Sequence, residues 1–197
     1  MSRESIEAAL RYLEQDLDLS KGFLVKLWGE EDAWAFVIKC HALLETAMSE
    51  LLSGFLVNDS FQELISFLPM GGKTGKVAFL RSSALISATE QTFLDELQNL
   101  RNSLVHNVHS VRFDFQTFMT TNPKQAKRLG RAAAAFGDDG EVRKRYEAEF
   151  EEAPRHVLWL ATLAVLARSR SALLKSEQQR RELAAHVRKL FEQGRTG

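Results

Sequence analysis

Residues 30–56 read EEDAWAFVIKCHALLETAMSELLSGFL, and this stretch decides the fold. Apolar residues fall on nearly every side of a helix drawn through it. Three carboxylates open it, where a helix dipole favours negative charge. A helix that is apolar nearly all round has to be covered by other elements. We therefore expect a central helix over residues 30–56, surrounded by the rest of the chain.

Apolar spacing and capping signals predict further helices on both sides of this one. Residues 87–90 read SATE, the order of a capping box, and predict the start of a helix that runs to about residue 106–108. Residues 111–115 are interpreted as a loop or an edge segment. The other expected helices cover residues 2–19, 59–68, 74–85, 123–136 and 154–191. With only 3 prolines and 11 glycines, the chain is predicted to be an all-α, up-and-down helical bundle with a long C-terminal helix.

The composition indicates one globular domain with an appendage. The chain has 197 residues, of which 45% are hydrophobic and 26% charged, values that argue against a disordered or fibrous protein. We expect a helical domain over residues 1–167 and a charged helical extension over residues 168–197. The extension carries eight basic and three acidic residues, whereas residues 1–63 carry five basic and twelve acidic ones. Leu183, Val187 and Leu190 recur in it at helical spacing.

The cysteine content and the N-terminus favour a cytoplasmic protein. A single cysteine, Cys40, excludes an internal disulfide framework and a cysteine-cluster metal site. Residues 1–5 are polar and begin no secretory signal. The longest apolar run, residues 157–167, is shorter than the ~20 residues of a membrane span. We therefore expect no association with a membrane.

The candidate site lies in residues 100–107, which read LRNSLVHN. On a helix, Arg101 lies about 40° from Leu97 and so falls on the apolar face, while Asn102 and His106 lie about 140° and 180° away. A guanidinium on a core-facing stripe is costly without an anion.

The expected anion is Glu45, which belongs to a polar stripe with His41 and Ser49 on the central helix. In one interpretation, an Arg101–Glu45 salt bridge only fixes the register of the bundle and His106 is a solvated residue near a helix C-terminus.

The segment Arg101-Asn102-x-x-x-His106 resembles the Arg-x4–6-His motif of the HEPN superfamily (higher eukaryotes and prokaryotes nucleotide-binding). Residues 43–47 resemble the acid-bearing long helix of that family, and residues 76–80 resemble the helix before the motif. The similarity spans roughly residues 30–166. It is closest to the branch of the mannitol operon repressor and related uncharacterised HEPN domains.

The resemblance implies a bundle that forms a homodimer and brings two motifs into one cleft. Active members are metal-independent endoribonucleases, of the kind found in bacterial toxin–antitoxin, stress and defence systems. In that function His106 transfers the proton, Arg101 holds the phosphate and Asn102 orients either group. Four further residues are expected to support the site: Glu45, His41, Asn107 and His109. No metal ion and no cofactor is expected.

Whether the chain is an enzyme is left open by its sequence. The alternative is a non-catalytic HEPN-fold regulator of the mannitol-repressor type, which acts on transcription through protein–protein contacts. No helix-turn-helix with a basic recognition helix is evident, so direct operator binding has no support. An antitoxin or structural adaptor is a third possibility, for which no residue argues specifically.

Basic residues outside the motif are candidates for contacts with an RNA backbone, with ordinary solvated side chains as the alternative. The glycine-rich stretch 71–76 lacks the spacing of a phosphate loop, because Phe67 stands where the first glycine should be. The candidate RNA-binding residues are Lys73, Lys76, Lys124, Lys127, Arg128 and Arg131.

Overall fold

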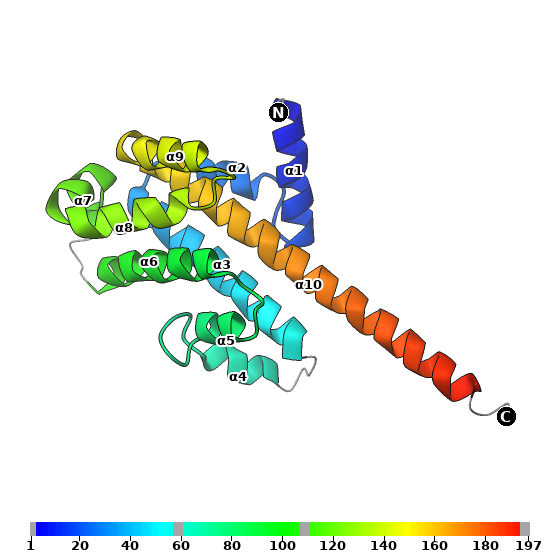
Figure 1. The fold of residues 1–197 in the computed structure, drawn as a ribbon. Helices are drawn as coiled ribbons and strands as arrows, with labels where there is room; N and C mark the ends of the chain where they lie inside the picture. The colour runs from blue at the N-terminus through cyan, green and yellow to red at the C-terminus, as the bar shows by residue number, and fades with distance from the viewer. Residues whose placement is uncertain (1–2, 57–60, 107–110, 194–197) are drawn as a thin grey trace.

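The computed structural model describes residues 3–56, 61–106 and 111–193, and within these ranges the chain is an all-α helical bundle, as the sequence predicts (Figure 1). The ten helices in these ranges are α1 (Arg3–Asp16), α2 (Phe23–Trp28), α3 (Ala33–Leu56), α4 (Phe61–Phe67), α5 (Lys76–Ser82), α6 (Ala88–Val105), α7 (Phe115–Thr121), α8 (Pro123–Ala134), α9 (Gly140–Glu152) and α10 (Pro154–Gln193).

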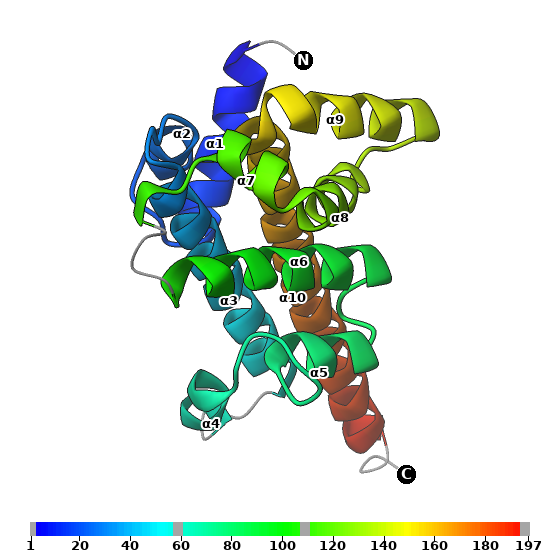
Figure 2. The ribbon, with the colours of Figure 1, turned by 90° about the vertical axis from the view of Figure 1, so that its left-hand side faces the viewer.

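Helices α3 and α10 form the centre of the bundle. They lie side by side, α6 crosses the pair, α8 and α9 cover one end, and α4 and α5 lie at the other (Figure 2). Phe36, Leu44 and Met48 of α3 and Leu158 and Val165 of α10 are completely or almost completely buried. The expectation of a central helix covered on most sides is therefore confirmed.

Local capping explains where the two helices that carry the candidate site begin. The Asp32 side chain accepts hydrogen bonds from the backbone N–H groups of Trp34 and Ala35, so α3 starts at Ala33 rather than at residue 30. Ser87 and Glu90 form the predicted capping box, in which each side chain accepts from the other residue's backbone N–H. That box fixes the first turn of α6.

Three short helices are absent from the sequence prediction. Helix α2 has only six residues between Gly22 and Gly29, too few for a periodic pattern. Helices α7 and α9 each start behind an aspartate whose side chain accepts from backbone N–H groups of the first turn, Asp114 and Asp139. Their apolar faces are narrow, so capping and packing on α8 hold them rather than a strong repeat.

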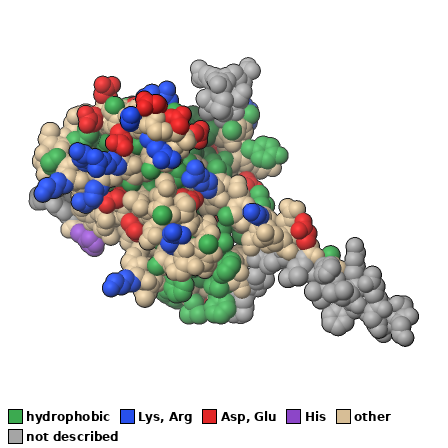
Figure 3. Space-filling model, in the orientation of Figure 1, with side chains coloured by type: hydrophobic (Ala, Val, Ile, Leu, Met, Phe, Trp, Pro, Cys, Tyr) green, Lys and Arg blue, Asp and Glu red, His purple; other side chains and the backbone are tan. Residues whose placement is uncertain are grey.

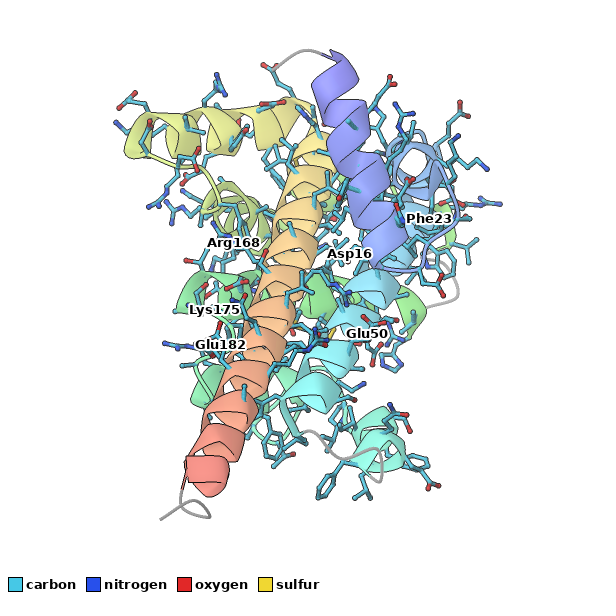
Figure 4. The ribbon with its side chains drawn as sticks, turned by 90° about the vertical axis from the view of Figure 1, so that its right-hand side faces the viewer. Asp16, Phe23, Glu50, Arg168, Lys175 and Glu182 are labelled. Atoms are coloured by element: carbon cyan, nitrogen blue, oxygen red, sulfur yellow. The ribbon has the colours of Figure 1, made fainter. Side chains whose placement is uncertain are left out.

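Helix α10 continues through residue 167, so the expected boundary between domain and extension falls inside one helix. Arg170 donates to Asp16 of α1 at 2.7 Å, and Leu173 is buried against Gly54 of α3, where a Cβ atom would lie 2.1 Å from Leu173 Cδ1. Beyond Leu173 none of the described side chains is buried. The body therefore ends near residue 173, and α10 projects from it (Figures 1 and 4).

One segment, Pro154–Gln179 of α10, is long and apolar enough to cross a membrane by length and composition alone. The expectation that the chain does not cross a membrane considers only the shorter uninterrupted apolar run, residues 157–167. Half of the most apolar window in this segment is buried inside the bundle, as in the core helix of a soluble protein. By itself the apolar character is weak evidence for a membrane.

Candidate functional site

The last turn of α6 presents the three residues of the motif. Arg101 and Asn102 are half-buried, and His106 is exposed at the C-cap of the helix. Arg101 Nη1 donates to Asn102 Oδ1 at 3.1 Å, and the backbone N–H of His106 donates to the carbonyl oxygen of Asn102 at 3.3 Å. The side chain of Asn102 therefore contacts Arg101, while its bond with His106 is the ordinary backbone hydrogen bond of the helix end.

This contact changes the geometry expected from helical periodicity. A straight helix separates Arg101 from His106 by about 140°, whereas Asn102 and His106 differ by only about 40°. Because the guanidinium is bonded to the Asn102 side chain, it is turned from the Leu97 face toward the side that carries His106. The angular separation of the cation from the imidazole is therefore smaller than helical periodicity alone predicts.

The expected salt bridge between Arg101 and Glu45 is wrong. Glu45 Oε1 lies 3.5 Å from Lys76 Nζ, and Glu45 Oε2 lies 3.8 Å from His41 Nδ1. Among the described residues, Arg101 forms no ion pair; its side-chain hydrogen bond is the one with Asn102. The arginine is therefore free to bind an anion from outside the chain.

A loop before α5 brings Lys76 to Glu45. Lys76 N donates to the Pro69 carbonyl oxygen and Val77 N to that of Met70, each at 2.9 Å, which closes residues 69–75 into a tight turn. The Lys76 side chain is only 3% exposed, so the ammonium is held inside the protein against Glu45. Lys76 is thus not available to an RNA backbone, and its assignment as an RNA-binding residue is corrected.

His41 lies on the buried side of α3 within the same group of charges. Burial lowers its pKa most; Glu45 opposes that shift, while the positive charges of Arg101 and Lys76 reinforce it. Its Nε2 is buried and has no hydrogen-bond partner among the described residues. His41 is therefore a neutral, internal neighbour of the site rather than a solvent-facing acid or base.

The other basic residues that are predicted to bind RNA differ in whether an acidic side chain pairs with them. Arg128 is bonded to Glu96 at 2.9 Å and Arg131 lies 3.8 Å from Glu147, so acidic neighbours offset both charges. Exposed and without an ion pair in the described ranges are Lys73, Lys124 and Lys127. Lys and Arg side chains gather over α7 and α8, near the end of α6 (Figure 3). Asn107 and His109 lie outside the described residues.

A cavity beside the motif escaped the sequence prediction. About 410 Å³ in volume, it lies between the last turn of α6 and helices α7 and α8, and Ser103, Arg112, Asn122 and Gln125 are among its lining residues. It was missed because α7 was not predicted. The one available signal was Asp114 followed three residues later by Thr117, the spacing of the observed N-cap hydrogen bond.

Neither a metal site nor a reactive cysteine finds support in the described part of the chain. No group of three or more His, Cys, Asp or Glu side chains is placed to hold a metal ion there. Cys40 is buried, and burial raises the pKa of its thiol to about 12 despite a hydrogen bond with Thr162. A thiol in that state is inert as a nucleophile.

Comparisons of this chain with protein-family models, with curated proteins and with solved structures gave no match.

Proposed function

We propose that this protein is a metal-independent endoribonuclease of the HEPN type and that Arg101, Asn102 and His106 form its active site. The observation that carries the proposal is the state of Arg101: its guanidinium has no carboxylate partner among the described residues and is held by Asn102 at the end of α6 where His106 is exposed. A half-buried arginine without an anion favours binding of a phosphate.

These side chains suffice for cleavage by the neighbouring ribose hydroxyl. His106 accepts the proton of the 2′-hydroxyl, the 2′-oxygen forms a bond to phosphorus, and the bond from phosphorus to the 5′-oxygen breaks. The leaving oxygen takes a proton from water or from a protonated histidine. Arg101 donates two hydrogen bonds to the non-bridging oxygens as their charge grows, and Asn102 keeps the guanidinium in place. The products carry a 2′,3′-cyclic phosphate and a 5′-hydroxyl.

The surroundings of the motif suit a polynucleotide better than a small anion. Lys124 and Lys127 on α8 are exposed and free of ion pairs within the described ranges, and such cations bind phosphates with release of counterions. A cavity of about 410 Å³ at the same end of α6, lined by Ser103 and Arg112, offers a second place for a nucleotide of the chain to bind. A cytoplasmic location is part of the proposal, because RNA is the substrate.

The experiment is cleavage of a labelled single-stranded RNA in excess EDTA by the wild-type protein and by His106→Ala. We expect the wild type to cut and the variant to lose at least about 100-fold in rate, the usual share of a general acid or base. Asn99→Ala, an exposed change two residues before Arg101 on the same helix, is the control and should cut at the wild-type rate.

Intact RNA with the wild-type protein, with or without divalent metal ions, would overturn the proposal. That result would favour the non-catalytic regulator instead. Equal cleavage by the wild type and by His106→Ala would assign the activity to other residues.

A further inference from the structure

A second cavity, of about 470 Å³, lies where the end of α2, the start of α7 and the junction of α9 with α10 meet (Figure 2). Its volume is in the range of pockets that hold small molecules. It shares no residue with the Arg101 motif. We call it the Trp28 cavity, and the lining residues that matter below are Trp28, Asp114, Phe115, Glu152, Arg155 and His156.

Two aromatic rings line the Trp28 cavity. The ring of Trp28 is 44% exposed, and its centroid lies 4.7 Å from the ring centroids of both His156 and Trp159 in T-shaped contacts. These contacts hold the ring in one orientation. Phe115, at the start of α7, supplies the second ring. A wall of fixed rings favours a flat apolar group or a cation, because no side chain has to be ordered on binding.

Two carboxylates of the lining are available to a ligand. The side chain of Asp114 accepts a hydrogen bond from the backbone N–H of Thr117 at 2.7 Å, and this bond lowers the pKa of the Asp114 carboxyl, which is therefore charged at neutral pH. Glu152 is exposed at the last position of α9. Neither carboxylate forms an ion pair within the ranges that the structure describes. Both negative charges thus remain without a cation.

The basic side chains of the lining are, in contrast, already engaged. Arg155 donates from Nη1 to the carbonyl oxygen of Glu30 and from Nη2 to that of Glu31. His156 Nδ1 is bonded to the carboxylate of Glu149, which balances any positive charge on the ring. Neither side chain is therefore well placed to bind an anion in the cavity.

The start of α10 also offers little to an anion. Pro154 has no backbone N–H, and the N–H groups of His156 and Val157 both donate to the carbonyl oxygen of Ala153. An anion at a helix N-terminus needs free N–H groups, and most of those in this first turn are used. The cavity thus favours a ligand that brings its own positive charge.

We propose that the Trp28 cavity binds a small organic cation, namely an ammonium group on a flat apolar body. The body packs on the rings of Trp28 and Phe115, and the ammonium donates hydrogen bonds to the carboxylates of Asp114 and Glu152. Such a site does not depend on whether the protein cleaves RNA.

The first measurement is titration calorimetry of the full chain with three probes that share a phenylethyl body and differ in charge. The probes are phenethylammonium, phenylethyl alcohol and hydrocinnamate. We expect the ammonium to bind at least about tenfold more tightly than the neutral alcohol, because it forms charged hydrogen bonds with the carboxylates. The anionic hydrocinnamate should bind more weakly than the alcohol.

The second measurement repeats the phenethylammonium titration with variants of the lining. Glu152→Gln should raise the Kd at least about fivefold, since it removes the charge and keeps the shape of the side chain. Glu151→Gln is the matched control: it removes the same charge from the neighbouring exposed position of α9, which does not line the cavity, and should leave the Kd unchanged. Trp28→Leu should raise the Kd about threefold or more. Far-ultraviolet circular dichroism checks that each variant is folded.

Four results would overturn the proposal. The first is no binding of phenethylammonium at millimolar concentration. The second is equal or tighter binding of the alcohol or of hydrocinnamate, which would make the cavity an apolar or an anion site. The third is an equal effect of Glu152→Gln and Glu151→Gln, which would reduce the preference to general surface charge. The fourth is tighter binding of a capped lysine amide, which would assign the cavity to a lysine side chain of a partner protein.

Discussion

Two cations, Arg101 and Lys76, are candidates for pairing with Glu45, and in the structure the Glu45 carboxylate lies against Lys76. The ammonium of Lys76 is buried and 3.5 Å from the carboxylate, while Arg101 is held by Asn102. A buried ammonium needs an anion more than a half-buried guanidinium does, because water cannot reach it. The charge of Glu45 is thereby neutralised inside the protein, whereas no carboxylate of the described residues neutralises that of Arg101.

This assignment predicts unequal effects of removing the two partners. Glu45→Gln leaves the Lys76 ammonium buried without an anion and should lower the free energy of unfolding by about 3 kcal/mol. Lys76→Met keeps the volume of the side chain and leaves Glu45 partly in water, so its cost should stay below about 1.5 kcal/mol. Urea denaturation measures both, and equal losses would contradict the assignment.

The lowered pKa of His41 predicts how the free energy of unfolding depends on pH. Burial first, then the charges of Arg101 and Lys76, lower its pKa in the folded protein below the ordinary value of 6.5, with Glu45 opposing them. Below that pH the unfolded chain binds a proton that the folded chain does not, so the free energy of unfolding falls as the pH drops and levels off below the folded pKa.

The check is urea denaturation between pH 7.5 and 5. His41→Gln should flatten the dependence in that range, and His106→Gln, at the exposed end of α6, is the control. A slope unchanged by His41→Gln would contradict the prediction.

At the scale of elements, the turn before α5 positions the charges of the site. A Cβ atom at Gly75 would lie 2.2 Å from the Gly71 carbonyl oxygen and 2.8 Å from that of Pro69. Neither oxygen belongs to a flexible side chain, and the turn is closed by the hydrogen bond from Lys76 N. Glycine is therefore required there for close packing of two backbone segments.

Gly75→Ala should accordingly destabilise the protein by about 2 kcal/mol or more, because the turn must open and draw Lys76 away from Glu45. Gly140→Ala is the matched control, since an added Cβ there meets nothing within 4 Å. Thermal unfolding of the two variants checks the prediction. A Gly75→Ala protein as stable as the Gly140→Ala protein would contradict it.

Sequence periodicity predicted the long helices well and the short ones poorly. Helices α3, α6 and α10 combine long apolar repeats with capping signals, and these depend on neighbours within a few residues. Helices α7 and α9 are held by aspartate N-caps and by packing on their neighbour α8, and α2 by packing on α1 and α10. None of the three has a wide apolar repeat, so periodicity did not predict them.

The residues of the candidate site could be predicted from the sequence, but the contacts between them could not. The spacing of Arg101, Asn102 and His106 placed all three at one end of α6, where the structure has them. The partner of Glu45 was mistaken, because Lys76 reaches it through a loop closed by backbone hydrogen bonds. Helical angles contain no information about such a loop.

At the scale of the whole molecule, the hydrogen bond that turns Arg101 toward Asn102, one helical turn before His106, predicts a site complete within one chain. An equimolar mixture of Arg101→Ala and His106→Ala should therefore remain as inactive toward RNA as either variant alone. Recovery of about a quarter or more of the wild-type activity in the mixture would show that two chains share each site, as the family resemblance implies.

The most direct test of the account is the chemistry of the ends that the protein leaves on RNA. In EDTA, an RNA substrate should yield 2′,3′-cyclic phosphate and 5′-hydroxyl ends, and a single 2′-deoxy substitution at the cleaved nucleotide should block that cut. Cleavage of the 2′-deoxy substrate, or ends that carry a 5′-phosphate, would contradict the assignment of His106 and Arg101 to attack by the ribose hydroxyl.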